Sequence, residues 1–299
     1  DLRMSRGLGD VYKRQRPTLL LNSHIDTVRP VDGWTRNPFS PDDDGERIYG
    51  LGSNDAGASV VSLTAAFLLL SQRQQRYNLV FLASCEEEVS GKGGIEAVLP
   101  LLPKIDVALV GEPTGMHPAV AEKGLMVLDG EIAGKSGHAA RDEGENAIYK
   151  ALPMIERLRS LSFPLTSAHL GPVKISVTQI SAGTQHNVVP DMCRIVVDVR
   201  TTDAYTNEQT LEMIRQAVPF CKLTPRSVRL RPSGISEQHP IVRRLVIAGR
   251  KPFGSPTLSD QALMPFPSLK IGPGDSARSH TADEYITYDE IREAIQIYF

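Results

Sequence analysis

Short apolar segments alternate with helical stretches from Pro17 to Pro113, and this alternation constrains the fold more than any other feature of the sequence. The predicted strands are 17–21, 78–84 and 107–111, and the helical stretches between them are 56–73 and 93–102. Strands separated by helices form a mainly parallel sheet with helices on both faces. We therefore expect an α/β domain whose ligand crevice lies at the carboxyl ends of the strands.

The pattern changes from about Lys123. It becomes a strand at 124–134, a helix at 146–161, strands at 173–180 and 193–200, and a helix at 207–218. This order predicts an inserted α+β sandwich, with one antiparallel sheet and helices on one face. Alternating α/β texture returns after about Ser236, with a helix at 241–250, a strand at 268–272 and a last helix. The expected organisation is a discontinuous domain of residues 16–118 and 236–299 that carries an inserted domain at 119–235.

The two ends of the sequence differ from the rest. Residues 1–15 show neither helical nor strand periodicity, so we expect them to be a leader foreign to the fold. At the other end, the helical pattern of 291–299 runs into the terminus without a capping Gly or Asn. We expect that last helix to be truncated.

Composition narrows the class of protein. An apolar content of 41%, a charged content of 23% and a net charge of -2 indicate a globular protein with no nucleic acid and no membrane surface as partner. Cys85, Cys193 and Cys221 are too scattered for a disulfide framework or a thiolate metal site, which favours a reducing cytoplasm. The longest apolar run, 65–70, is far shorter than a membrane span, and no secretory leader is visible.

Residues that can carry chemistry follow the predicted strands. They are His24 with Asp26, Asp55, the run Glu86–Glu88, Glu112 and, late in the chain, His280. Taken singly, each has an ordinary structural explanation, such as a strand-end turn, a helix cap, a solvated edge or a surface histidine. Taken together, they need a common explanation.

A metal site explains this set. Three adjacent carboxylates after a buried strand repel one another, and a cation relieves that repulsion. Two imidazoles with several carboxylates suit zinc, or cobalt and manganese as substitutes. A carboxylate that bridges two ions holds them about 3.5 to 4 Å apart. Asp26 lies two residues beyond His24 and can reach the second nitrogen of that ring, which would fix its tautomer.

Seven motifs occur in order along the chain. They are SHIDTV, YGLGSNDAG, SCEEEVSG, VGEPTG, GKSGHAA, HNVVPD and SHTADEY. Over residues 17–299 the set closely resembles the co-catalytic zinc amidohydrolase family, which contains acetylornithine deacetylase, succinyl-diaminopimelate desuccinylase, aminoacylases and glutamate carboxypeptidase. The resemblance implies an α/β catalytic domain, two divalent cations, zinc with cobalt able to substitute, and hydrolysis of an amide bond.

The resemblance also implies roles for single residues. The implied metal ligands are His24, Asp55, Glu88, Glu112 and His280, with Asp55 bridging the two ions and with His24 and Glu112 on the same ion. Glu87 is the implied general base, and Asp26 orients His24. His138 is implied to reach the partner subunit's active site and stabilise the oxyanion, which requires a homodimer through the inserted domain. Asn187 is implied to contact the substrate, and Arg200 could bind its carboxylate by a two-pronged hydrogen bond.

Several stretches narrow the substrate. The segments 21–41, 50–63, 122–130 and 254–285 resemble the acetylornithine deacetylase branch of arginine biosynthesis most. The implied substrate is N-acetyl-L-ornithine or N-succinyl-L-ornithine, with Ser259 and Asp275 in the substrate-binding loop. Succinyl-diaminopimelate desuccinylase is the nearest alternative, and a dipeptidase or aminoacylase comes next. A metal-binding but inactive fragment is an alternative of a different class.

Nucleotide-binding motifs fail on particular residues. The GKS of 134–136 resembles a phosphate-binding loop, but that loop needs a glycine at 129, where this chain has Asp129. The pair Gly50 and Gly52 begins a dinucleotide-binding fingerprint whose third glycine would be residue 55, which is Asp55. The sequence therefore does not favour a nucleotide enzyme.

Overall fold

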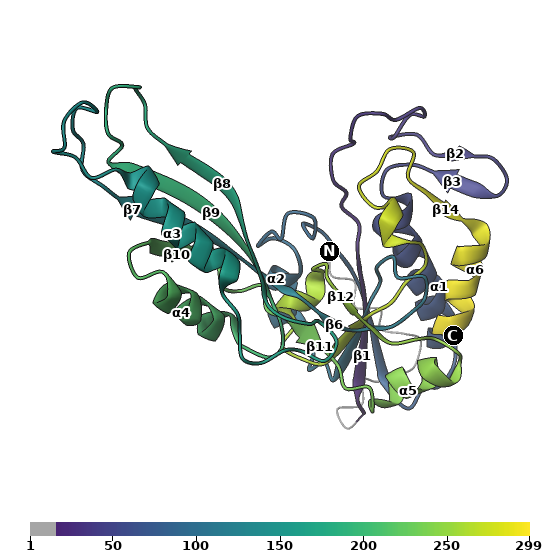
Figure 1. Cartoon of the computed structure of the whole chain (residues 1–299). Helices are drawn as coiled ribbons and strands as arrows, with labels where there is room; N and C mark the ends of the chain where they lie inside the picture. The colour runs from purple at the N-terminus through teal and green to yellow at the C-terminus, as the bar shows by residue number, and fades with distance from the viewer. Residues whose placement is uncertain (1–15) are drawn as a thin grey trace. The chain divides into compact units, whose positions relative to one another are not determined.

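A computed structural model describes residues 16–299 of the chain, so the expected leader at 1–15 lies outside the described residues. Contacts within the chain divide it into two compact units, which are described separately (Figure 1). The first unit holds the chain up to Ala121 together with Gly234–Gly254 and Ser259–Phe299, and the second holds Glu122–Ser233 and Ser255–Leu258. For comparison, the sequence pattern places the insertion at 119–235.

A seven-stranded sheet forms the centre of the first unit. Its order is β11-β6-β13-β5-β1-β4, with β12 paired to β6. The strands are β1 (Thr18–His24), β4 (Asn78–Ser84), β5 (Val107–Val110), β6 (Ala119–Glu122), β11 (Ser233–Gly234), β12 (Phe253–Ser255) and β13 (Ser268–Lys270). β1 is parallel to β4 and β5, and β13 is parallel to β5, whereas β6 is antiparallel to β13. The expected mainly parallel sheet is confirmed.

Helices cover both faces of this sheet. They are α1 (Ala58–Ser71), α2 (Ile95–Val98), α5 (Pro240–Ile247) and α6 (Tyr288–Tyr298), with the 3₁₀ helices η2 (Leu99–Leu101), η3 (Asp260–Leu263) and η4 (Ser276–Arg278). On one face, Leu20 belongs to a buried cluster with Ile95 of α2. On the other, Leu269 belongs to a cluster with Val242 of α5 and Ala294 of α6. Because side chains alternate between the faces of a strand, both faces are apolar and both need cover.

Two local features depart from the sequence prediction. The helix expected over 93–102 is only Ile95–Val98, followed by a 3₁₀ turn that contains Pro100, because proline lacks the N–H that an α-helix needs. The segment Ser53–Ser71 is long and apolar enough to cross a membrane by length and composition alone, a test that buried core helices also pass. Here its helix α1 packs against β1, β4 and α6.

A small antiparallel sheet was not predicted. Its order is β14-β3-β2, formed by β2 (Asp42–Asp43), β3 (Arg47–Tyr49) and β14 (Tyr285–Thr287). Tyr49 is paired with Tyr285, and their rings lie 5.5 Å apart. Because β3 leads toward the turn that carries Asp55 and β14 follows the loop that carries His280, this pairing brings the two loops together.

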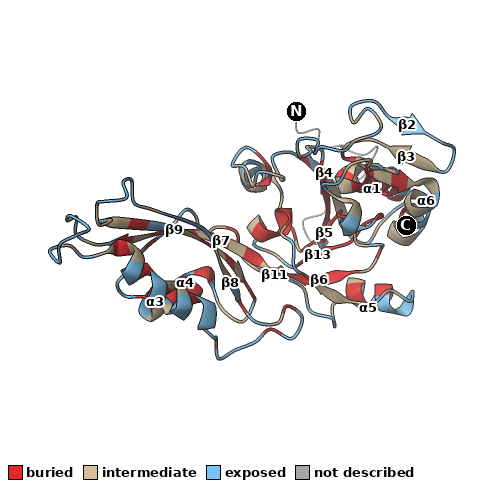
Figure 2. Ribbon diagram, turned by 45° about the horizontal axis from the view of Figure 1, so that its top comes forward, coloured by how far each residue is buried: buried red, intermediate tan, exposed pale blue. Residues whose placement is uncertain are grey.

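The second unit is the expected α+β sandwich. Its sheet has the order β10-β7-β9-β8, formed by β7 (Gly124–Ala133), β8 (Lys174–Ala182), β9 (Met192–Thr201) and β10 (Lys222–Pro225). Helices α3 (Ala147–Ser160) and α4 (Asn207–Ala217) share a buried cluster with β7 and β9, while their outer sides are exposed (Figure 2). β8 and β10 are the two edge strands, and Ile180 of β8 is 56% exposed.

Candidate metal centre

Three parallel strands of the first unit deliver polar residues to one edge of the sheet. β1 ends at His24, which is paired with Ser84 at the end of β4. Asn22 of β1 is paired with Val110, the last residue of β5, and Glu112 follows two residues later. The register therefore brings His24, the glutamates after β4 and Glu112 to the same edge, where open α/β sheets bind ligands.

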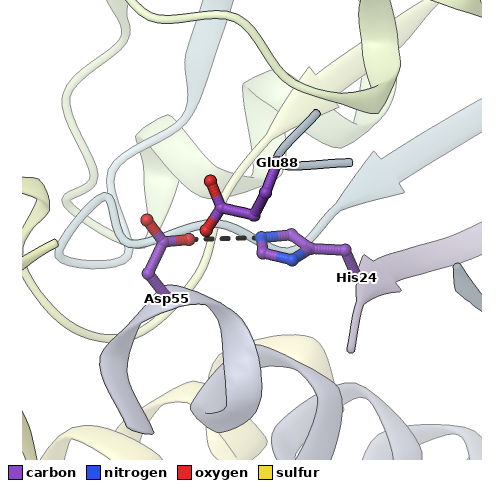
Figure 3. A group of neighbouring side chains, drawn as sticks. All are labelled: His24, Asp55 and Glu88. Carbon is purple, nitrogen blue, oxygen red and sulfur yellow. Dashed lines mark hydrogen bonds and ion pairs between the residues drawn. The ribbon is translucent and has the colours of Figure 1, made fainter. Parts of the chain in front are cut away.

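Asp55 lies between two pairs of side chains. Its Oδ1 is 3.2 Å from His24 Nε2, and Glu112 Oε1 is 3.6 Å from the same nitrogen. Its Oδ2 is 3.7 Å from His280 Nε2, which lies 3.1 Å from Glu88 Oε2. Figure 3 shows Asp55 and Glu88 directed toward the ring of His24. Each oxygen of one carboxylate thus faces its own histidine and glutamate.

The His24 ring is oriented by backbone rather than by a side chain. Its Nδ1 donates a hydrogen bond to the backbone carbonyl of Asp26 at 2.9 Å, whereas the Asp26 carboxylate is 3.6 Å away. With the proton on Nδ1, Nε2 is free to bind a cation. The Asp26 carboxylate instead accepts the backbone N–H groups of Glu87 and Glu88, each at 3.2 Å. Asp26 therefore orients both the histidine and the glutamate turn, by different atoms from the one expected.

The three adjacent glutamates have three different surroundings. Glu86 has a left-handed backbone (φ 60°) and is exposed, and its carboxylate accepts the N–H of Gly93 at 2.8 Å. This turn sends Glu86 away from the centre, whereas Glu88 contacts His280. His280 has the same left-handed backbone (φ 60°). Such conformations cost free energy in residues other than glycine and cluster at functional sites.

The carboxyl groups of the centre lie close together and away from water, and this shifts their pKa values and that of His24. Burial raises the pKa of Glu87 to about 8, and burial together with the charge of Asp55 raises those of Glu88 and Glu112. Burial lowers the pKa of His24, but the hydrogen bond with Asp55 and the charges of Glu112 and Glu87 outweigh this effect and raise it to about 11. Burial raises the pKa of Asp55, but the bond and charge of His24 outweigh it, so that the net shift is downward.

A divalent cation fits this set of residues. Ligand atoms of His24, Asp55 and Glu88 all lie within 4.8 Å of one another. Glu112 Oε1 is buried and accepts no hydrogen bond from any residue in the described range 16–299. A buried oxygen without a donor is costly, and a cation would satisfy it. Imidazole nitrogens and carboxylate oxygens are among the ligands that bind zinc in proteins.

Sequence reasoning missed the part played by Glu284. Its side chain is buried, and its carboxylate accepts the backbone N–H groups of Gly52, Asn54 and Asp55 at 2.9, 2.9 and 2.8 Å. It belongs to the motif SHTADEY, but no local pattern pairs it with residues some 230 positions earlier. The small sheet brings these segments together, and its short strands could not be recognised in the sequence.

The residues predicted for the substrate loop have structural contacts of their own. Ser259 is 2% exposed, and its hydroxyl caps η3. Its neighbour Asp260 is also buried and accepts a hydrogen bond from Ser84 at 2.5 Å. Asp275 caps η4 through its carboxylate and is exposed. Substrate contact by Ser259 and Asp275 stays a prediction.

His138, Asn187 and Arg200 belong to the second unit. His138 is on an exposed loop, beside the loop of Asn187, whose carbonyl accepts the N–H of Ala139 at 3.0 Å. Arg200 donates two hydrogen bonds to Asp198, at 2.9 and 3.1 Å. A substrate carboxylate would have to compete with Asp198 for this guanidinium. The roles expected for these three residues stay predictions.

Two known enzymes are similar to this chain in sequence. The acetylornithine deacetylase of Pectobacterium carotovorum subsp. carotovorum (strain PC1) is 29% identical over 292 residues, which cover 90% of this chain and 75% of the relative. The succinyl-diaminopimelate desuccinylase of Paracoccus denitrificans (strain Pd 1222) is 32% identical over 213 residues, which cover 66% of this chain and 56% of that relative.

Comparison with solved structures and family models agrees. The aminopeptidase PepT of Bacillus cereus ATCC 10987 superposes with a TM-score of 0.75 at 20% sequence identity, over 95% of this chain and 80% of that one, which shows a common fold. Residues 20–299 match the model of the peptidase family M20/M25/M40. Since this match spans the strand ends, the centre and the second unit, the chain belongs to the peptidase family M20/M25/M40.

Proposed function

We propose that the protein is a two-cation amidohydrolase that releases L-ornithine and a short carboxylate from N-acetyl-L-ornithine or N-succinyl-L-ornithine. The observation that carries the proposal is the arrangement at Asp55, whose two oxygens face His24 with Glu112 and His280 with Glu88. A carboxylate placed in this way is suited to bridging two ions. Zinc is the proposed cation, with cobalt as a substitute.

The residues of the chain divide the chemistry between them. When bound, the cations polarise the amide carbonyl and make a water more acidic. Glu87 then takes a proton from the attacking water and returns it to the leaving amine nitrogen as the C–N bond breaks. Burial raises the pKa of this carboxylate to about 8, so that it is a stronger base than an exposed glutamate. Nearby cations would lower this pKa. Asp26 holds the backbone of Glu87 in place.

The choice of substrate rests on sequence similarity. The named relatives include an acetylornithine deacetylase matched over 90% of this chain. A desuccinylase at 32% identity supports succinyl-diaminopimelate as the second candidate, although the match covers a smaller share of both chains. A dipeptidase or general aminoacylase is the third. The candidate substrates all contain a scissile amide bond, and they differ in the groups on either side of it.

We further propose that the second unit forms a homodimer and supplies His138 to the partner subunit's active site. Among residues 16–299, no strand pairs with the outer side of β8, which carries the exposed Ile180, and the outer side of α3 exposes Tyr149 and Leu152. An edge strand beside exposed apolar side chains suits pairing with a second chain. The cytoplasmic location is likewise proposed, and it agrees with the free thiols of the chain.

The test is a substrate panel. The full chain is loaded with zinc or cobalt and incubated with N-acetyl-L-ornithine, N-succinyl-L-ornithine, N-succinyl-diaminopimelate and a dipeptide, and the released primary amine is measured. We expect the largest kcat/KM with one of the two acyl-ornithines. A larger value with succinyl-diaminopimelate or the dipeptide would reassign the substrate.

Metal content separates an inactive protein from an inactive preparation. Each sample is analysed for bound zinc or cobalt after gel filtration. Two ions per chain without amine release from any substrate would support the metal-binding but inactive alternative. Fewer than two ions under saturating conditions would contradict the two-cation proposal itself.

A further inference from the structure

We propose that Glu284 is the positioning residue for the bridging carboxylate, and that it sets the affinity of both cations at once. The inference rests on the proposed function, because it concerns the two-cation centre. Glu284 itself is not among the expected ligands, and its carboxylate bonds are made to backbone N–H groups. It acts through Asp55.

The contacts of Glu284 fix the turn that ends in Asp55. One carboxylate oxygen accepts the N–H of Gly52 at 2.9 Å, and the other accepts those of Asn54 and Asp55 at 2.9 and 2.8 Å. The N–H of Gly50 is bonded to the backbone carbonyl of Glu284 at 3.1 Å. Since Glu284 is 2% exposed, water does not compete for these bonds.

A second set of bonds ties the same two segments together. The side chain of Asn54 accepts the N–H of Asp275 at 3.0 Å and donates to the carbonyl of Asp275 at 3.1 Å and to Ser279 at 3.3 Å. Ser279 precedes His280, the histidine on the Oδ2 side of Asp55. One clamp therefore holds a shared ligand and the neighbouring histidine.

The shared position of Asp55 determines the effect of losing Glu284. Since Asp55 Oδ1 faces His24 and Oδ2 faces His280, a shift of its backbone would move one oxygen away from each histidine and so disturb the residues that would hold either cation. Loss of a residue that supported only His280 would instead weaken the binding of one cation. Partners that orient metal ligands typically change metal affinity by roughly 10- to 100-fold.

Two substitutions of Glu284 are expected to give different losses of cation affinity. Glu284→Ala removes both carboxylate oxygens and with them all three hydrogen bonds to the turn. Glu284→Gln keeps one oxygen, which can stay with Asn54 and Asp55, but places an amide N–H₂ against the N–H of Gly52. A buried donor facing another donor is unsatisfied, so the turn loosens from its Gly52 end.

The adjacent Asp283 provides a matched control. Its carboxylate also accepts three bonds, from the N–H and hydroxyl of Thr35 at 2.9 and 2.6 Å and from the N–H of Arg36 at 3.2 Å. None of these donors belongs to the turn of Asp55. Asp283→Asn therefore changes an acid to its amide one residue away without touching the bridging ligand.

The experiment titrates Co²⁺ into the metal-free full chain by calorimetry and follows the visible absorption of the bound ion. Wild type and Asp283→Asn are each expected to bind two ions, and the affinities of the variant are expected to equal those of wild type. Both Glu284 variants are expected to bind each ion roughly 10- to 100-fold more weakly, Glu284→Ala the more so, with altered cobalt absorption. Thermal unfolding of the metal-free chains checks that each variant is folded, and Glu284→Gln carries the test if Glu284→Ala is not.

The outcomes are distinct. A folded Glu284→Gln that binds both ions as wild type does, with the same absorption, overturns the positioning role. Weakening of only one ion overturns the claim that Glu284 acts through the shared ligand. Equal weakening in Asp283→Asn assigns the effect to the loop as a whole and also overturns the proposal. A wild-type chain that does not bind two ions instead contradicts the proposed function.

Discussion

Replacing Glu87 by glutamine removes a proton acceptor at the centre while it leaves the local structure in place. The bonds that hold this residue are made by backbone, since its N–H donates to the Asp26 carboxylate at 3.2 Å. Glutamine has the same shape and keeps that N–H. The change therefore tests the chemical role of the carboxylate rather than its packing.

The expected loss is large in turnover and small in metal content. A positioned general base contributes about 10²- to 10⁴-fold, which is about 3 to 5 kcal/mol of barrier. The buried carboxylate, with its pKa of about 8, is the group suited to accept the proton. We expect kcat for the best acyl-ornithine to fall by that factor in Glu87→Gln, with two ions still bound.

The neighbouring glutamates give two comparisons with the same substitution. Glu88→Gln removes the carboxylate that lies 3.1 Å from His280 Nε2, so we expect it to lose metal affinity before anything else. Glu86→Gln affects an exposed side chain that accepts a bond from Gly93, and its amide oxygen can keep that bond. Glu86→Gln should therefore retain both metal and turnover.

The assay is amine release against substrate concentration, with metal content measured on the same samples. If Glu87→Gln lost its metal together with its activity, Glu87 would be a ligand, and the assignments of base and ligand would have to be exchanged. If it kept wild-type turnover with both ions bound, another group would be the base.

Three further predictions concern metal binding, packing and assembly. The pKa of His24, about 11 without metal, means that a bound cation displaces its proton. Apparent Zn²⁺ affinity should therefore fall by at least about tenfold per pH unit on acidification, and calorimetry in buffers of different ionisation enthalpy should detect the proton release. Gly272→Ala would place a Cβ 2.3 Å from Ser59 Oγ and 2.5 Å from the Glu112 carbonyl, so thermal denaturation should show about 1 to 3 kcal/mol of lost stability, and an unchanged midpoint would contradict the packing. Ile180→Lys on the exposed edge strand should shift the sedimentation of the proposed dimer to that of a monomer, and an unshifted dimer would place the interface elsewhere.

Long apolar strands and amphipathic helices were predictable from sequence because their patterns are local. The strand predicted at 78–84 is β4, and the helix predicted at 207–218 is α4 over Asn207–Ala217. The strands of the small sheet are two or three residues long, too short for a period to show. The pairing of β3 with β14 joins residues more than 200 positions apart, such as Tyr49 and Tyr285.

The candidate metal centre was also predictable only in part. Candidate ligands such as His24 and Glu112 could be named because each follows a buried strand and belongs to a motif. The orienting contacts could not, because they are made by backbone atoms: the carbonyl of Asp26 holds His24, and N–H groups of the Asp55 turn hold Glu284. Sequence letters identify side chains, whereas these contacts depend on where the chain turns.

The two ends of the inserted segment meet. β6, which leads into the second unit, and β11, which leads back, are neighbours in the sheet, and the N–H of Ile235 is bonded to the carbonyl of Val120 at 2.9 Å. All five candidate ligands belong to the first unit. Because the chain leaves and re-enters the first unit at neighbouring strands, insertions and surface changes within residues 122–233 can accumulate during evolution without moving the five candidate ligands.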